Sequence, residues 1–593
     1  MRKLLKYLKP FTRLVALMVL LTLGRAMGEL ALPALMAGMM NQGMLKGDIG
    51  YILTNGLWML LTALGAAACS IAGSFVSSRI GAGFARDLRS AVFSRVEDYS
   101  LHEFDQIGAA SLINRTTNDM VQIQTTLVMA FRFVIYAPVM CVGGILMASV
   151  RGDSTVTAIL VAAISALILF MVVISRFAMP MFQIIQKKLD HLNLVLRENL
   201  TGIRVIRAFN KLRYERDRFR NANRDLTDVS IRAQQLMAAM NPLMMLFINL
   251  TILVIVWFSS GKVVQDRLQI GDMVAFIQYA TQILFSFIMI TMMFMMIPRV
   301  QASAERINEV LDMTPEILDP SAAAEPARPA GTGAAGTGTG PELKGRVEFD
   351  HVSFFYPGAE LPALKDLSFT AEPGKTTAIL GGTGAGKSTL VNLIPRFYDV
   401  SAGRILMDGT DIRQMTQDSL RKRVGFVPQT AVLFSGSVNG NIRLGKEDAS
   451  EEEIRRALET AQALDFVSQL PDGFGSRLAQ GGVNLSGGQR QRLSIARALV
   501  RKPDIYVFDD SFSALDFKTD ALLRAALKQE TQEAAVIIVA QRVSTIMNAD
   551  QIIVLDQGEI VGAGVHRDLL QTCAIYHEIV ASQLPEEEWL NER

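Results

Sequence analysis

Residues Gly381–Thr389 read GGTGAGKST and follow an apolar run, Thr376–Leu380, that is a candidate strand. The spacing is G-x-x-x-x-G-K-S between a predicted strand and a predicted helix, which is the context that a phosphate-binding loop requires. Glycines allow successive backbone N–H groups to turn toward phosphate oxygens, and the helix directs its positive end at them. The stretch therefore predicts an α/β domain that binds a nucleotide. The predicted nucleotide-binding residues of the loop are Gly381, Gly382, Thr383, Gly384, Ala385, Gly386, Lys387, Ser388 and Thr389.

The same loop predicts a magnesium site. Lys387 can reach the β- and γ-phosphates, and the hydroxyl of Ser388 can bind Mg²⁺. A second apolar strand, Ile505–Phe508, ends at Asp509. An acidic residue at that position is placed to hold Mg²⁺ through water. ATP and Mg²⁺ are therefore the predicted cofactors.

The first half of the chain is strongly apolar. Half of the 593 residues are hydrophobic, 20% are charged, and the mean hydropathy is +0.27, whereas about 25% of residues are charged in a typical soluble protein. The formal charge of +2 implies no nucleic-acid partner. This composition excludes a soluble cytosolic enzyme, a disordered protein and a nucleic-acid binder that works by bulk charge. Six apolar runs are long enough to cross a membrane core of ~30 Å, and they cover residues 14–40, 52–77, 127–149, 155–178, 238–261 and 273–297.

Basic residues predict the orientation of these spans. Five Lys or Arg residues and no acidic residue precede the first span, and the segment 176–232 carries thirteen Lys or Arg residues. By the positive-inside rule, both termini and the long polar segments 79–125 and 179–236 are cytoplasmic.

A change in composition predicts where the domains divide. Residues 321–340 read SAAAEPARPAGTGAAGTGTG, which cannot bury a core and is typical of a flexible tether. After it, short β-rich runs alternate with helical segments. We therefore predict a membrane domain over 1–312, a linker over 313–344 and a nucleotide-binding domain over 345–593.

Two further stretches reveal a family resemblance. Residues 484–492 read NLSGGQRQR and residues 508–516 read FDDSFSALD. Together with GGTGAGKST they resemble the motifs of an ABC transporter nucleotide-binding domain. With six preceding spans, the chain resembles a half-size ABC exporter of the type IV class. The resemblance implies an all-α six-helix membrane domain followed by a soluble α/β P-loop domain. It also implies a dimer that sandwiches two ATP molecules.

The resemblance assigns roles to several more residues. Tyr356, before Pro357, matches the aromatic that stacks on adenine, and Gln429 matches the glutamine that touches Mg²⁺. Asp516 matches the loop that links the two ATP sites. The signature, which would reach the γ-phosphate bound to the partner chain, comprises Ser486, Gly487, Gly488 and Gln489.

The resemblance also implies how the two domains communicate. Residues 104–119 and 198–209 resemble the coupling segments of exporters, which dock on the nucleotide-binding domains. Ordinary amphipathic helix surface is the alternative reading of both segments.

Three positions depart from the family pattern. Asp510 stands where the family has a glutamate as the general base for the attacking water, and Gln541 stands where it has a histidine that contacts the γ-phosphate. Gln480 replaces a glutamate before the signature. The carboxylate of Asp510 sits roughly 1.5 Å further back than that of a glutamate, and a misplacement of ~1 Å can reduce the rate ~10²-fold. Glutamine donates hydrogen bonds but carries no positive charge.

These changes predict a site that holds ATP with little hydrolysis. The pattern resembles the degenerate subunit of bacterial heterodimeric multidrug exporters, in which the intact signature of this chain would serve the partner's competent site. We therefore predict a heterodimeric translocase subunit in the bacterial plasma membrane that exports amphipathic or drug-like cargo. One alternative is a homodimeric lipid or drug flippase with slow ATP hydrolysis. Another is an ATP-gated regulatory membrane subunit that pumps nothing.

The membrane domain carries two features that could contact cargo. Methionines and phenylalanines crowd residues 285–296 of the last span, where soft side chains suit a promiscuous pocket and equally suit contact with lipid. Arg25 and Glu29 lie four residues apart inside the first span. Charges inside a membrane are candidates for functional sites, although a self-neutralising pair that only shapes the bundle is the alternative.

Overall fold

The computed structural model describes residues 3–150, 154–265, 267–294, 296–320 and 344–585. The chain divides into two compact units. The first comprises Met1–Glu97 and Ala109–Met313, and the second comprises Asp98–Gly108 and Thr314–Arg593. The short segment Asp98–Gly108 thus groups with the second unit, although it falls inside the predicted membrane domain. Most of the predicted linker, residues 321–343, lies outside the described residues.

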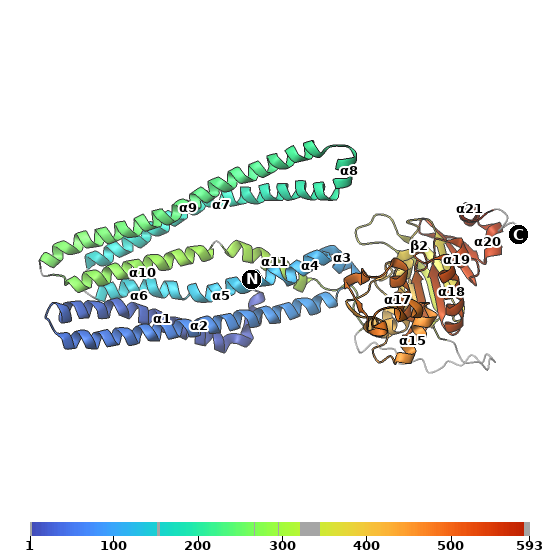
Figure 1. Cartoon of the computed structure of the whole chain (residues 1–593), viewed down its shortest axis with the longest axis horizontal. Helices are drawn as coiled ribbons and strands as arrows, with labels where there is room; N and C mark the ends of the chain where they lie inside the picture. Colours follow the sequence, from blue (N-terminus) through green and yellow to red (C-terminus); the bar gives the residue numbers. More distant parts are fainter. Residues whose placement is uncertain (1–2, 151–153, 266, 295, 321–343, 586–593) are drawn as a thin grey trace. The chain divides into compact units, whose positions relative to one another are not determined.

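The first unit is built of long helices (Figure 1). Within the described residues, six of its helical segments are long and apolar enough to cross a membrane, as predicted. Helices satisfy every backbone N–H and C=O group within one segment, which a span in hydrocarbon requires. The helices are η1 (Leu4–Phe11), α1 (Thr12–Gly38), η2 (Met39–Met44), α2 (Ile49–Glu97), α4 (Ala109–Thr116), α5 (Asn118–Phe133), α6 (Tyr136–Val150), α7 (Ser154–Thr201), α8 (Ile203–Ala208), α9 (Leu212–Val264), α10 (Ile270–Phe294) and α11 (Ile297–Asp312).

Several of these helices are much longer than a bilayer needs. Helix α7 has 48 residues and α9 has 53, whereas about 20 residues cross the hydrocarbon core. The excess residues form the polar segment 179–236, in which α7 and α9 lie side by side and are joined by α8 (Figure 1). Ion pairs link the two helices there, with Arg218 of α9 lying 2.6 Å from Glu198 of α7.

The second unit contains two main sheets. A six-stranded sheet has the order β12-β11-β3-β10-β9-β6, and all its pairings are parallel except β11 with β12. An antiparallel sheet has the order β2-β1-β4-β5. The strands are β1 (Val347–Phe354), β2 (Leu364–Ala371), β3 (Thr376–Gly381), β4 (Ala402–Met407), β5 (Thr410–Asp411), β6 (Val424–Val427), β7 (Gly436–Ser437), β8 (Arg477–Leu478), β9 (Ile505–Asp509), β10 (Ala535–Val539), β11 (Gln551–Asp556) and β12 (Glu559–Gly564).

Helices flank these strands, as expected of an α/β domain (Figure 1). The helices of the second unit are α3 (Leu101–Ile107), α12 (Lys387–Leu393), η3 (Ile412–Gln414), α13 (Gln417–Lys422), α14 (Val438–Arg443), α15 (Glu451–Thr460), α16 (Leu464–Ser468), η4 (Gly473–Gly475), η5 (Gln480–Gly482), α17 (Gly487–Leu499), α18 (Phe517–Glu530), α19 (Val543–Ile546), α20 (His566–Thr572) and α21 (Ala574–Gln583).

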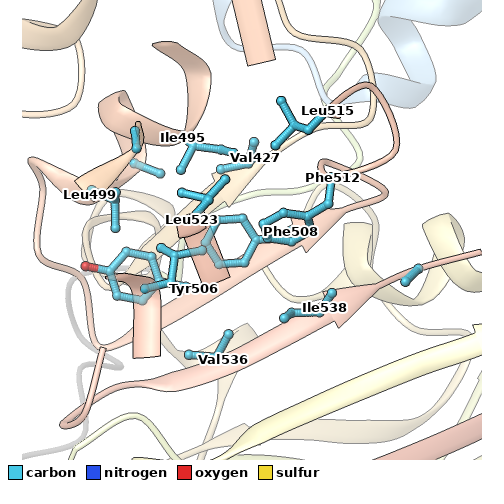
Figure 2. Close-up of a cluster of buried hydrophobic side chains, with 14 of the residues drawn as sticks. Val427, Ile495, Leu499, Tyr506, Phe508, Phe512, Leu515, Leu523, Val536 and Ile538 are labelled. Carbon is cyan, nitrogen blue, oxygen red and sulfur yellow. The ribbon is translucent and has the colours of Figure 1, made fainter. Parts of the chain in front are cut away.

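Strand β9 is buried on both of its faces. On one face, Tyr506 and Phe508 pack among Ile495, Leu523 and Ile538 (Figure 2). On the other face, Ile505 and Val507 join a second core that includes residues of the antiparallel sheet. A parallel strand that is buried on both faces has a nearly continuous apolar sequence, which explains the run Ile505–Phe508. This packing fixes the carboxyl end of β9, where the functional side chains begin.

Candidate nucleotide site

A cavity of about 450 Å³ opens at the carboxyl ends of β3 and β9. In open parallel sheets ligands bind at this edge. The loop after β3 forms one wall, and its Gly386 has a φ of +95°. A Cβ atom at Gly386 would also lie 2.7 Å from the carbonyl oxygen of Ala363, so only glycine fits there. The lining residues are Tyr356, Pro362, Ala363, Thr383, Gly384, Gly386, Lys387, Ser388, Thr389, Gln429, Asp509, Asp510, Val539, Gln541, Gln557 and Gly558.

Lys387 is the buried cation of this cavity. Its Nζ donates to the carbonyl oxygens of Gly381 and Gly382, at 2.8 and 2.7 Å. Burial lowers the pKa of Lys387, and the nearby charges of Asp510 and Asp509 oppose that shift. The loop thus holds a compact positive charge at its centre, which suits contact with phosphate oxygens.

Oxygen donors for a magnesium ion meet on the floor of the cavity. The hydroxyl of Ser388 donates to Oδ1 of Asp509 at 3.2 Å. Asp509 is 6% exposed, and burial together with the charge of Asp510 raises its pKa against the influence of Ser388 and Lys387. A buried carboxylate beside a second carboxylate is stabilised by a cation. Mg²⁺ takes one or two carboxylates and completes its shell with water and substrate phosphates, so these residues fit that ion.

Asp510 lies beside two glutamine side chains. Its Oδ2 accepts hydrogen bonds from Nε2 of Gln541 at 2.9 Å and from Nε2 of Gln429 at 3.3 Å. Burial raises the pKa of Asp510 despite these contacts and the nearby charges of Lys387 and Arg542. The backbone of Asp510 has a φ of +45°, which non-glycine residues seldom adopt. The carboxylate is therefore held in one place by its neighbours.

Tyr356 supplies an aromatic surface at the cavity wall. Its hydroxyl lies 2.9 Å from Oγ1 of Thr389. Edge contacts with Phe354 and Tyr398 orient the ring. The residue is 38% exposed, so part of the ring is available to stack on a flat base.

The signature residues start a helix elsewhere on the same domain. Ser486 caps α17 and exchanges hydrogen bonds with Gln489, whose backbone N–H lies 3.2 Å from the Ser486 hydroxyl. A Cβ atom at Gly487 would meet nothing within 4 Å. Asp516 caps α18 in a similar way, accepting from the N–H of Thr519 at 2.9 Å, and that contact lowers the pKa of Asp516.

The structure thus separates the predicted site residues into two groups. The cavity gathers Tyr356, Thr383, Gly384, Gly386, Lys387, Ser388, Thr389, Gln429, Asp509, Asp510 and Gln541. Among the described residues, the lining does not include Gly381, Gly382, Ala385, Ser486, Gly487, Gly488, Gln489 or Asp516. The first three of these belong to the loop itself, whereas the others lie at the starts of α17 and α18.

Sequence reasoning missed five lining residues. Pro362 and Ala363 precede β2, Val539 ends β10, and Gln557 and Gly558 form the turn between β11 and β12. Gly558 has a φ of +81° and packs against Ala363. The sequence DQG between two apolar runs is a turn signal, but it gives no indication that the turn reaches a nucleotide site.

Comparisons with known proteins agree with this geometry. The family model of the ABC transporter transmembrane region matches residues 15–287, and the ABC transporter model matches residues 364–513. The chain is 42% identical to an uncharacterised ABC transporter ATP-binding protein of Mycobacterium tuberculosis, over 98% of this chain and 97% of that protein. It is 31% identical to an ATP-dependent lipid A-core flippase of Thiobacillus denitrificans, over 98% of each chain.

A solved structure gives the same result for the fold. A bacterial Atm1-family ABC exporter with ATP bound matches 97% of this chain and 99% of its own, with a TM-score of 0.79 and 28% sequence identity. The family models, the relatives and the shared fold thus cover both halves of the molecule. The chain belongs to the ABC transporter family and is a half-size ABC exporter with a six-helix membrane domain and an ATPase domain.

Proposed function

We propose that this chain is the degenerate-site subunit of an ATP-driven heterodimeric exporter. It would reside in the bacterial plasma membrane with its nucleotide-binding domain in the cytoplasm and move amphipathic cargo outward. One observation carries the proposal. Asp510, which takes the place of the family's glutamate, is held by Gln541 and Gln429, while Lys387 and Asp509 of the same cavity are in place.

The residues of this cavity suit tight binding of ATP. Tyr356 would stack on adenine, the loop would hold the phosphates, and Ser388 and Asp509 would hold Mg²⁺. Bound Mg²⁺ neutralises charge that develops on the phosphates. Asp510 is too short to bring its carboxylate to a water in line with the γ-phosphate, and its Oδ2 already accepts two hydrogen bonds. General-base catalysis contributes ~10²–10⁴-fold, so we expect hydrolysis here to be slow by a factor in that range.

The signature of this chain would complete the competent site of a partner subunit. Ser486 presents a hydroxyl at the start of α17, and Gly487 leaves its backbone N–H uncovered. Both groups are donors suited to a phosphate oxygen. ATP binding would bring the two nucleotide-binding domains together, the segments 104–119 and 198–209 would transmit that closure to the membrane helices, and hydrolysis at the partner's site would reset the transporter.

A homodimeric lipid flippase is the second candidate. The lipid A-core flippase of Thiobacillus denitrificans, which resembles this chain over its whole length, supports it. In that case the two ATP sites would be identical and both would turn over slowly.

Two substitutions on opposite sides of the domain distinguish the candidates. The experiment purifies the full transporter through a tag on this chain and measures its steady-state ATPase activity. Gly487→Asp places a carboxylate against the γ-phosphate bound to the partner, and like charges at 4 Å repel by about 4 kcal/mol at an effective dielectric constant of ~20. We expect this variant to lose nearly all activity, and Asp510→Ala to lose less than about half.

A matched control separates charge from backbone effects. Gly487→Ala adds a Cβ atom where nothing lies within 4 Å, so it should retain most of the activity. Equal losses in Gly487→Asp and Asp510→Ala would overturn the heterodimer proposal and favour two equivalent sites. If the active transporter that is purified contains this chain and no second kind of subunit, that result would also favour a homodimer. An absence of vanadate-sensitive dye uptake into inside-out vesicles would overturn both and favour a regulatory subunit.

A further inference from the structure

A polar cluster lies in the first membrane span. Nε of Arg25 donates to Oε1 of Glu29 at 2.8 Å, and the hydroxyl of Tyr136 in α6 donates to Oε2 of the same carboxylate. The guanidinium of Arg25 also lies over the ring of Tyr136, 4.6 Å from its centre. Both oxygens of Glu29 are therefore engaged, one by each neighbour.

A third helix closes the back of this cluster. Nε2 of Gln282 in α10 donates to the backbone carbonyl of Glu29 at 3.3 Å, and the hydroxyl of Tyr279 donates to that of Leu30 at 3.1 Å. Leu30 and Tyr279 are buried in a core shared by α1, α6 and α10. Oε1 of Gln282 is buried and has no hydrogen-bond partner among the described residues. Three helices thus fix the cluster and leave one buried acceptor unused.

The cluster lies near the middle of the first candidate span. Glu29 is about 26 Å along the helix from Thr12 and about 22 Å from Met44, at a rise of ~1.5 Å per residue. A hydrocarbon core of ~30 Å centred on this stretch would therefore enclose Glu29. Charged side chains at this depth are costly and mark functional positions. The side chains of Arg25 and Glu29 are nevertheless 34% and 27% exposed, so part of each is left uncovered by the protein.

The groups of this cluster that remain available to a ligand are N–H donors of Arg25. Glu29 engages Nε of Arg25, and the guanidinium also donates to the Tyr136 side chain. The other N–H donors on the terminal nitrogens of the guanidinium remain for a ligand. A planar guanidinium binds two oxygens of one carboxylate or phosphate group in parallel. Glu29, by contrast, is satisfied by Arg25 and Tyr136 and offers little to a cationic ligand.

We propose that Arg25 anchors the head group of the cargo, and that this head group is an oxyanion, a carboxylate or a phosphodiester, on an apolar body. Glu29 and Tyr136 are positioning residues that hold the guanidinium, and Gln282 supports them from α10 through its bond to the Glu29 carbonyl. This inference rests on the proposed export of amphipathic cargo and names the chemistry that the membrane domain selects.

The test compares matched acyl probes on the reconstituted transporter. Oleate carries a carboxylate, lysophosphatidylglycerol carries a phosphodiester, and oleyl alcohol is the neutral match for oleate. The readouts are the probe concentration that gives half-maximal stimulation of ATPase activity, and uptake of labelled probe into inside-out vesicles. Loss of a charge-assisted hydrogen bond weakens binding by about 10- to 100-fold. Arg25→Gln should raise the half-maximal concentration of the anionic probes by that factor and leave oleyl alcohol unchanged.

Control variants keep the result interpretable. Arg79→Gln removes an exposed arginine of α2, in the polar segment 79–125 and no part of the cluster, and it should alter no probe. Arg25→Gln combined with Glu29→Gln leaves no unpaired charge in the membrane, so it tests the anchor even where the single variant folds poorly. Response to oleate but not to lysophosphatidylglycerol would assign the site to carboxylates, and the converse to phosphodiesters.

Two outcomes would overturn the inference. One is equal stimulation by oleate and oleyl alcohol, and the other is an anionic response that survives in both Arg25 variants. Transport of a cationic amphipathic dye separates these failures from failure of the proposed function. If the dye is exported while no anionic probe acts, amphipathic export stands and the oxyanion anchor is wrong. If neither dye nor probe is exported, both are wrong.

Discussion

A longer carboxylate side chain at position 510 and a side chain at position 541 that can carry positive charge should restore hydrolysis at this chain's own ATP site. The change is Asp510→Glu combined with Gln541→His. The added methylene moves the carboxylate forward, and histidine removes an amide that now donates to Oδ2 of Asp510 at 2.9 Å. It also supplies a group that can carry positive charge beside the γ-phosphate.

The expected gain follows from the geometry. The carboxylate of aspartate lies roughly 1.5 Å short of the position that a glutamate reaches, and a misplacement of ~1 Å can reduce the rate ~10²-fold. Release of Asp510 from Gln541 leaves the weaker contact with Gln429, at 3.3 Å. We therefore expect the double variant to raise hydrolysis at this site by about 10- to 100-fold.

The assay must first abolish ATP hydrolysis at the other ATP site of the transporter. Gly487→Asp in this chain should do so, because in the proposed heterodimer its signature would complete that site. In this background the remaining ATPase activity of the purified transporter belongs to the cavity described above. Single-turnover measurement with radiolabelled ATP then reports the rate of the chemical step, independent of product release.

The single variants show which change matters. Asp510→Glu alone keeps the Gln541 amide beside the carboxylate and should give a smaller gain than the pair. Gln541→His alone restores no reach and should give almost none. If the double variant hydrolyses ATP no faster than the Gly487→Asp transporter alone, then neither the short side chain at position 510 nor the uncharged side chain at position 541 limits hydrolysis at this site. The cause would then lie with another element, such as Gln480 or the partner's signature.

Two further predictions concern other parts of the second unit. The carboxylate of Glu103 is buried and accepts hydrogen bonds from the backbone N–H groups of Ser100 at 2.8 Å and Glu316 at 3.0 Å. Burial alone would raise the pKa of Glu103. These bonds and the bond from the Ser100 hydroxyl outweigh burial and lower the pKa. Because the folded pKa is depressed, the stabilisation is present above the unfolded value of ~4.3 and is lost as pH falls through the folded value. Glu103→Gln should therefore weaken hydrogen-exchange protection of α3 by about 1–2 kcal/mol at pH 7. The difference should persist down to about pH 4 and shrink below it, and Asp105→Asn on the same helix should change nothing. A difference that stays constant below about pH 4 would refute this account. Tyr356→Ala should weaken ATP binding, measured by calorimetry, by about 1–3 kcal/mol, and Phe355→Ala at its exposed neighbour should change it little. Unchanged nucleotide affinity in Tyr356→Ala would remove Tyr356 from the base site.

Much of the fold could be predicted because its physical causes are local. Long uncharged runs have to be helices in a membrane, and the six predicted spans correspond to the six candidate spans. The run Ile505–Phe508 forms the buried strand β9, and Asp509 ends it as predicted. The phosphate-binding loop lies between β3 and α12, as its spacing indicated.

Other features depend on contacts between distant parts of the chain. Gly558 reaches the nucleotide cavity because β11 pairs with β3, which places the following turn beside Ala363. Asp98–Gly108 groups with the nucleotide-binding unit because Glu103 bonds to Glu316, more than two hundred positions later. Neither pairing leaves a periodic signal in the sequence. The side chains of residues 290–295, where the methionine-rich cluster was predicted to contact cargo, lie outside the described part of the chain.

The Asp510 region shows most clearly what a sequence can and cannot give. An aspartate in place of a glutamate predicts only a shorter side chain, and a longer-range rearrangement could restore its reach. The structure adds a second ground for proposing slow hydrolysis, because Gln541 and Gln429, from two different parts of the sheet edge, donate to the same carboxylate oxygen. Both donors occupy Oδ2 of Asp510, so Oδ1 is the oxygen left to accept a proton from water. Reach and occupancy therefore act on one carboxylate, so a change of Asp510 alone and a change of Gln541 alone should each recover less than the pair.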